Sequence, residues 1–114
     1  MRIAIIGSRK ILGSEEYWYQ KICEKIPPKL TEIVSGGADG IDTLARRYAY
    51  EHGILFKEFP PDYKRYGKSA AYIRNAQIVE YADMAFAFWD GKSRGTADAI
   101  IKFYRSNKPV RIYF

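Results

Sequence analysis

The sequence predicts a doubly wound α/β fold, in which helices cover both faces of a mostly parallel, five-stranded sheet. Segments typical of strands alternate with segments typical of helices along the 114 residues, which is the pattern of a parallel sheet. The strand segments are continuous apolar runs, such as residues 3–6 and 84–88, and such runs are typical of strands buried on both faces. The connection between two parallel strands of one sheet is right-handed, so only a few sheet topologies are compatible with this order of strands and helices.

The first half of the chain is expected to form two strands and two helices, with the strands over residues 2–8 and 32–35 and the helices over 14–26 and 40–53. Ser14 can accept a hydrogen bond from the first turn of the first helix, and Pro27 cannot continue that helix. Apolar residues recur with helical spacing after Gly40, and Gly53 ends the second helix.

The second half is expected to form three strands and two helices, with the strands over residues 54–59, 84–90 and 110–114 and the helices over 69–81 and 96–106. Pro60 and Pro61 end the third strand, and the segment 60–68 is expected to be a loop. Pro109 separates the last helix from the last strand. This strand runs to the last residue, so residues 1–114 are expected to form one complete minimal domain.

The composition narrows the class of protein. No apolar run approaches the roughly 20 residues of a membrane span, and the N-terminal apolar run lacks the cleavage site of a signal peptide, so we expect a cytoplasmic protein that does not enter a membrane. One cysteine and one histidine are too few for a disulfide or a zinc site, and we expect no metal and no cofactor. The net charge of +6 either favours anionic partners, such as nucleotides or nucleic acid, or only keeps the protein soluble.

Glycine-rich turns follow three of the predicted strands: GSR at residues 7–9, GGADG at 36–40 and DGKSRGT at 90–96. Ligands of doubly wound sheets bind at the carboxyl ends of the strands, so these turns are expected to meet at one rim. Glycine leaves backbone amides uncovered, and a helix start suits a phosphate. The turn at 36–40 is therefore an anion cradle or, alternatively, a tight turn without a ligand. Its spacing matches neither GxGxxG nor the P-loop.

Backbone amides alone bind an anion too weakly to form such a site. A helix terminus contributes roughly 0.3 to 1 kcal/mol to anion binding, whereas micromolar affinity needs about 8 kcal/mol. Charge-assisted hydrogen bonds of roughly 1.5 to 3 kcal/mol each are needed in addition. Arg9, Arg74 and Arg94 are the arginines expected nearest the rim, and each offers a planar fork suited to phosphate.

The segment 62–72 interleaves aromatic and cationic residues. Such a mixture can stack bases and neutralise phosphates of a single strand. The segment is otherwise a mobile basic loop, or a lid over the rim from which Lys68 reaches a ligand phosphate.

Taken together, GSR, SGGADGID, GKSAAYIRN and WDGKSRGT resemble the motifs of the Rossmann-like SLOG superfamily, which includes the DNA-processing protein A and the LOG-type, lysine decarboxylase-like proteins. The four motifs occur in the same order over nearly the whole chain, and short single-domain bacterial and phage members are the most similar branch. The resemblance implies a Rossmann-like nucleotide-binding domain over residues 1–114. The residues that it implies for the ligand site are Gly7, Ser8, Arg9, Gly36, Gly37, Asp39, Gly40, Arg74, Asn75, Arg94, Gly95 and Thr96.

The sequence departs from the LOG-type motif PGGxGTxxE, whose glutamate assists cleavage of an N-glycosidic bond. The matching stretch here is SRGTADA, so the glutamate position falls on Ala99, and Asp98 lies one residue away on another side of the helix. Asp39, Asp42 and Asp90 are the alternative carboxylates for this role, and the sequence does not single out a catalytic residue.

Three functions remain open at this point. The chain binds a nucleotide or a nucleotide-derived ligand, as a sensor or processing protein; or it binds single-stranded nucleic acid; or it hydrolyses a nucleotide N-glycosidic bond with a non-standard carboxylate. We favour binding over catalysis because no acid–base pair is evident. Tyrosine-rich helix faces also indicate a possible homo-oligomer.

Overall fold

The computed structural model describes residues 1–11 and 13–114, which form five strands and five α-helices with one short 3-10 helix. In chain order these elements are β1 (Arg2–Gly7), α1 (Glu15–Lys25), β2 (Glu32–Ser35), α2 (Ile41–Glu51), β3 (Leu55–Glu58), α3 (Tyr63–Tyr66), η1 (Gly67–Ser69), α4 (Ala70–Tyr81), β4 (Met84–Phe88), α5 (Arg94–Arg105) and β5 (Val110–Tyr113). The expected alternation of strands and helices is therefore confirmed.

The five strands form one sheet in the order β3-β2-β1-β4-β5, and every neighbouring pair is parallel. The sheet is thus wholly parallel, where the sequence predicted a mostly parallel one. Strand β1 lies at the centre, with Ala4 opposite Val34 of β2 on one side and Ala85 of β4 on the other. Strands β2 and β3 are added on one side of β1, and β4 and β5 are added on the other side. The strand order therefore reverses between β1 and β4, and doubly wound folds bind ligands at the carboxyl ends of the strands at such a switch point.

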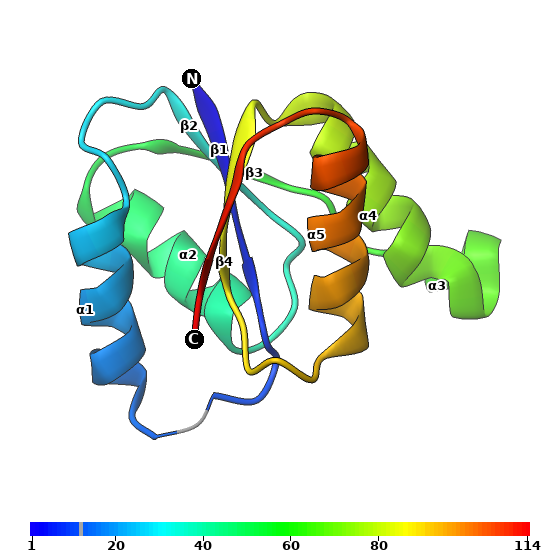
Figure 1. The fold of residues 1–114 in the computed structure, drawn as a ribbon, viewed down its shortest axis with the longest axis horizontal. Coiled ribbons are helices and arrows are strands. Elements are labelled where there is room, and N and C mark those ends of the chain that lie inside the picture. Colours follow the sequence, from blue (N-terminus) through cyan, green and yellow to red (C-terminus); the bar gives the residue numbers. More distant parts are fainter. Residues whose placement is uncertain (12) are drawn as a thin grey trace.

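Helices cover both faces of the sheet, as predicted. Helices α1 and α2 lie on one side, and α4 and α5 lie on the other (Figure 1). Strand β1 contributes to both cores, because successive side chains of a strand point to opposite faces. Ile3 and Ile5 pack with α1 and α2, whereas Ala4 and Ile6 pack with α4 and α5. Burial on both faces explains why this strand is continuously apolar.

Two sequence expectations were wrong in detail. The segment 60–68, expected to be a loop, contains α3 and the start of η1. Helix α3 forms because the Asp62 side chain accepts a hydrogen bond from the backbone N–H of Arg65, which caps its first turn. The edge strands β3 and β5 are also not buried on both faces, and Leu55 and Ile112 are exposed. Edge strands have one neighbour and less helix cover, which explains the difference.

None of the helices in the described part of the chain combines the length and the apolar character that a bilayer crossing requires.

Candidate functional site

A pocket of about 440 Å³ opens at the carboxyl edge of the sheet, on the side of α4 and α5. Its walls come from the turns after β1, β2 and β4, from the segment α3–η1, and from α4 and the first turns of α5. We call it the rim pocket. Five cationic and two acidic side chains line it: Arg9, Lys10, Lys68, Arg74, Arg94, Asp42 and Asp90. Its volume lies in the range typical of ligand sites, and its charge suits an anion.

The turn after β1 is held against the end of β4 by hydrogen bonds. The backbone N–H of Ser8 donates to the carbonyl of Phe88 at 3.2 Å, and the Ser8 hydroxyl accepts from the backbone N–H of Asp90 at 3.0 Å. A Cβ on Gly7 would collide with the Phe88 carbonyl and with the side chain of Ile41. Glycine is therefore needed at position 7 so that β1, β4 and α2 can meet at the rim.

Arg74 forms part of the floor of the rim pocket from inside the protein. Its Nη1 donates to the Gly36 carbonyl at 2.6 Å, and its Nε donates to Asn75 Oδ1 at 2.9 Å. The guanidinium occupies the space where a Cβ on Gly36 would lie. The missing side chain of Gly36 thus makes room for a protein arginine, which takes the place predicted for a ligand at this glycine.

Asn75 links the same helix to the start of α5. Its Nδ2 donates to the Gly95 carbonyl at 3.1 Å and to Asp98 Oδ2 at 3.0 Å. Asp98 in turn forms an ion pair with Lys102. Both Arg74 and Asn75 are buried, with exposed fractions of 7% and 4%, so the pair does not belong to the solvated face of α4.

Asp42 is a buried carboxylate in the wall of the rim pocket. Burial raises its pKa to about 6, while the hydrogen bond from the Ala38 backbone N–H, at 3.1 Å, and the positive charge of Arg74 oppose the rise. Burial also lowers the pKa of Arg74, and the charge of Asp42 opposes that change. Each of the two charges therefore favours the ionised form of the other, beneath the more exposed cations.

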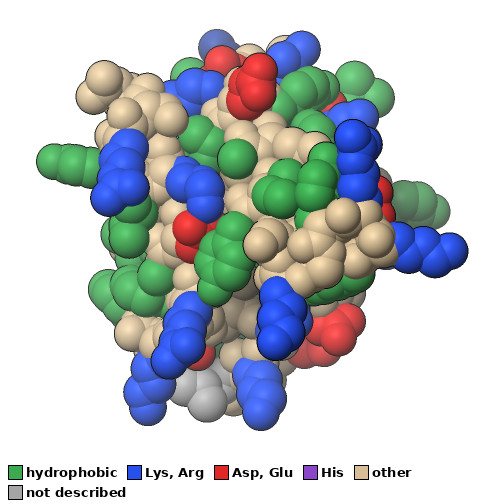
Figure 2. Space-filling view, turned by 90° about the vertical axis from the view of Figure 1, so that its right-hand side faces the viewer, with side chains coloured by type: hydrophobic (Ala, Val, Ile, Leu, Met, Phe, Trp, Pro, Cys, Tyr) green, Lys and Arg blue, Asp and Glu red, His purple; other side chains and the backbone are tan. Residues whose placement is uncertain are grey.

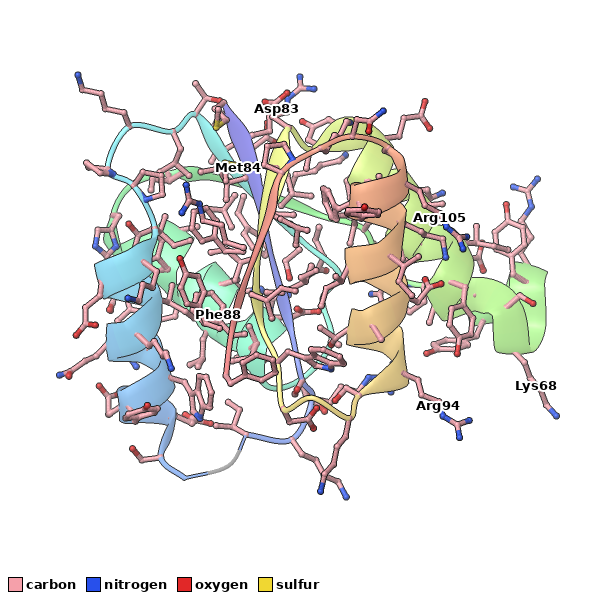
Figure 3. All side chains as sticks on the ribbon, viewed as in Figure 1. Lys68, Asp83, Met84, Phe88, Arg94 and Arg105 are labelled. Carbon is pink, nitrogen blue, oxygen red and sulfur yellow. The ribbon has the colours of Figure 1, made fainter. Side chains whose placement is uncertain are left out.

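Four cations around the pocket are free to meet a ligand. Within the described residues, the side chains of Arg9, Lys10, Lys68 and Arg94 are exposed and make no hydrogen bond or ion pair. Figure 2, which shows the face formed by α3–α5, has several Lys and Arg side chains around its lower edge. Lys68 and Arg94 extend away from the body of the protein (Figure 3). Unpaired cations around a concave site favour a polyanion or a phosphate.

The start of α5 is organised by Asp90. Its carboxylate accepts hydrogen bonds from the backbone N–H groups of Lys92 and Ser93, both at 2.8 Å, and from the Ser93 hydroxyl at 3.0 Å. These bonds lower the pKa of Asp90, so the carboxylate stays ionised. The turn places Gly95 and Thr96 against the rim pocket, where the N-terminus of α5 adds a partial positive charge.

The structure brings together eight of the twelve residues predicted for the site. The residues that line the rim pocket are Gly7, Arg9, Gly36, Arg74, Asn75, Arg94, Gly95 and Thr96. Ser8 instead lines a smaller pocket on the other side of the β1 exit. Gly37, Asp39 and Gly40 line neither pocket. Asp39 is exposed, and the cap residue of α2 is Gly40, without a side-chain hydrogen bond.

Sequence reasoning missed Lys10, which lines the rim pocket although it was assigned no role. Tyr63 and Tyr72 also line it, and both belong to the segment 62–72, for which base stacking was one expectation. Asp42 lines the rim pocket as well, although the sequence named it only as one of three alternative carboxylates. Lys10 could have been found from its place directly after Arg9, in the turn that leaves the central strand.

The position of the LOG-type glutamate is also visible. Ala99 is buried and contributes only a methyl group to the pocket wall, while Asp98 binds Asn75 and Lys102. In the described part of the chain, no group of three His, Cys, Asp or Glu side chains is arranged to hold a metal ion.

Comparisons with known proteins agree with this fold. The Gene 61 protein of Mycobacterium phage D29 is 29% identical over 119 residues, covering 96% of this chain and 93% of the phage protein. A solved structure of DNA processing protein A from Helicobacter pylori, which concerns its single-stranded DNA binding mode, matches with a TM-score of 0.75 and 18% identity. That match covers 98% of this chain but 64% of the Helicobacter chain. The model of the DNA recombination-mediator protein A family matches residues 1–59, about half of the chain. By its motifs, its fold and this match, the chain belongs to the DNA recombination-mediator protein A family.

Proposed function

We propose that this protein binds single-stranded DNA along the carboxyl rim of its sheet, with phosphates held in and beside the rim pocket. The observation that carries the proposal is the set of four unpaired cations, Arg9, Lys10, Lys68 and Arg94, around one concave site. A chain of phosphates matches several cations at once, because its charges are repeated and flexible. The single-stranded DNA binding described for the Helicobacter neighbour supports the same choice of ligand.

Aromatic side chains beside these cations add a second kind of contact. Tyr63 and Tyr72 line the rim pocket, and 54% and 44% of their surfaces are exposed. Their rings are accessible to bases that leave the stacked strand, and stacking of one base on an aromatic side chain contributes about 1 to 3 kcal/mol. Because every base has a flat face, such contacts favour single strands without demanding a sequence. The segment 62–72 is thus assigned to the binding surface.

The proposal is tested by measuring the affinity of a fluorescent oligothymidylate at several salt concentrations. If four cations each contact a phosphate, log K should fall with log salt with a slope of about −3, because each contact to a single strand contributes about −0.7. An oligonucleotide too short to reach all four cations should give a shallower slope. Affinity that does not respond to salt or to oligonucleotide length would exclude this mode of binding.

A mononucleotide or nucleotide-derived ligand is the second candidate. The volume of the rim pocket favours it, since about 440 Å³ falls within the range of small-molecule sites. A thermal-shift panel of nucleotides and ADP-ribose compounds separates the two functions. A mononucleotide present at 100 times its dissociation constant should stabilise the fold by about 2.7 kcal/mol, and it should displace the oligonucleotide.

A further inference from the structure

We infer that a second pocket, across the exit of β1 from the rim pocket, takes one nucleobase of the bound strand. We call it the aromatic pocket. This inference rests on the proposed binding of single-stranded DNA and adds to it a site for a base, separate from the phosphate site.

The aromatic pocket has a volume of about 160 Å³ and lies on the side of the sheet covered by α1 and α2. Its walls are mainly apolar, and they are formed by Ile11, Trp18, Ile41, Phe88, Trp89 and Phe114. Ser8, Lys10 and Asp90 supply its polar edge. The pocket is smaller than the usual site of a whole ligand, so it has room for one ring system and not for a complete nucleotide.

Aromatic rings from three parts of the chain form these walls. Trp18 comes from α1, Trp89 follows β4, and Phe114 follows β5. The rings of Trp89 and Phe114 lie 6.0 Å apart at 32°, and Trp89 Nε1 donates to the Ser93 carbonyl at 3.1 Å. That hydrogen bond fixes the Trp89 ring before a ligand arrives. Phe114 is 69% exposed, so its ring remains accessible.

The two pockets share part of their walls. Lys10 and Asp90 line both of them, and Ser8, whose hydroxyl accepts from the Asp90 backbone N–H, stands at the junction. A phosphate beside Lys10 is therefore close to the mouth of the aromatic pocket. One strand can reach across the turn after β1 with its phosphate on the cationic side and an adjacent base on the aromatic side. The apolar walls exclude the phosphate itself, because burying an unpaired charge is costly.

The experiment compares a labelled oligothymidylate with an oligonucleotide of the same length whose bases are replaced by abasic tetrahydrofuran residues. Both carry the same phosphates, so only contacts to bases differ. We expect the wild-type protein to bind the oligothymidylate at least tenfold more tightly, and Trp18→Ala or Phe114→Ala to remove about tenfold of that preference while binding of the abasic strand stays unchanged. Quenching of tryptophan fluorescence should accompany binding of the strand with bases only.

Tyr50→Ala is the matched control, since Tyr50 is 87% exposed near the end of α2 and lines neither pocket. It should leave both affinities unchanged. If Trp18→Ala does not fold, Phe114→Ala still tests the inference, because the Phe114 ring is mostly exposed and its removal should not prevent folding. If a folded Phe114→Ala or Trp18→Ala protein keeps the wild-type preference for the oligothymidylate over the abasic strand, the aromatic pocket does not bind a base. The proposed binding of DNA would still stand. Failure to bind either strand would overturn the proposed function and this inference with it.

Discussion

The arginines of α2 differ from the cations of the rim in one respect: they already have partners. Arg46 forms an ion pair with Glu58 of β3, and Arg47 pairs with Glu16 of α1 and with Glu51 one turn further along α2. These contacts join elements within the half of the protein that contains α1 and α2. A phosphate that approached them would first have to break an existing pair.

The four rim cations have no such partner within the described residues. Arg9 and Lys10 come from the turn after β1, Lys68 from η1 and Arg94 from the start of α5, and all four line the same pocket. The net charge of +6 is therefore a poor guide to binding, because paired and unpaired cations contribute equally to it. What distinguishes a binding surface is a set of cations that have no ion-pair partner, and substitutions in the two sets of cations test that distinction.

Arg74 differs from the other cations of the rim, because it is buried and its guanidinium donates hydrogen bonds to protein groups. Its removal should have the largest effect of the substitutions considered, and this effect should be on stability. Arg74→Ala leaves the Gly36 carbonyl and the charge of Asp42 without their partner. Leaving a buried acceptor and a buried charge uncompensated costs about 1 to 3 kcal/mol each, or about 3 to 5 kcal/mol in total. The free energy of unfolding in urea at pH 7 should fall by that amount. Gln77→Ala, an exposed change on the same helix, is the control. A loss below about 1 kcal/mol would show that Arg74 is not structural.

Removing two of the unpaired cations should have the next largest effect, and it should be confined to binding. The double variant Arg9→Ala, Arg94→Ala loses two charge-assisted contacts, so its affinity for an oligothymidylate should fall about 100-fold. The salt slope should become shallower by about 1.4. Its melting temperature should match that of the wild-type protein, because neither side chain is tied to another in the described structure. Unchanged affinity would remove the rim cations from the binding surface.

Asp42 should make stability depend on pH. Its pKa is raised from 3.8 to about 6 in the folded protein, so the folded state holds this proton more tightly than the unfolded chain. As pH rises from 4 to 6 the unfolded state releases the proton first, and the stability contributed by the protonated group is lost. A shift of this size corresponds to about 2 to 3 kcal/mol.

The variant Asp42→Asn cannot titrate at this position and isolates the effect. Urea unfolding of both proteins between pH 4 and pH 7 should show the wild-type protein losing about 2 kcal/mol relative to the variant. Parallel pH profiles would mean that Asp42 ionises normally.

The smallest effect is expected for the paired arginines of α2. The double variant Arg46→Ala, Arg47→Ala removes the same charge as the rim double variant, but it should weaken oligothymidylate binding less than twofold at 150 mM salt, where distant charges are screened. A loss as large as that of the rim variant would mean that total charge, and not its pairing, controls binding.

The elements of this fold could be predicted because their signals are local. Apolar runs, caps and prolines placed all five strands and the main helices close to their observed bounds. Helix α3 was not predicted, because this four-residue helix depends on one capping hydrogen bond, which the Arg65 backbone N–H donates to the Asp62 side chain. The rim was predicted because the carboxyl ends of parallel strands lie at the same edge, and eight of the predicted residues do line one pocket.

Other features depended on contacts between distant residues. Arg74 and Gly36 are 38 positions apart in the chain, yet the arginine fills the space that the glycine leaves. The aromatic pocket joins Trp18, Trp89 and Phe114, which come from three separate parts of the sequence.

The sequence by itself determined the order of strands and helices, the glycines that let strands approach closely, and the excess of positive charge. Only the tertiary structure decided which cations are paired, which polar side chains are buried, and which aromatic rings share a cavity. The physical reason is that hydrophobic periodicity and capping act over a few residues, whereas ion pairs, desolvation and cavities depend on which groups the folded chain brings within a few ångströms of one another.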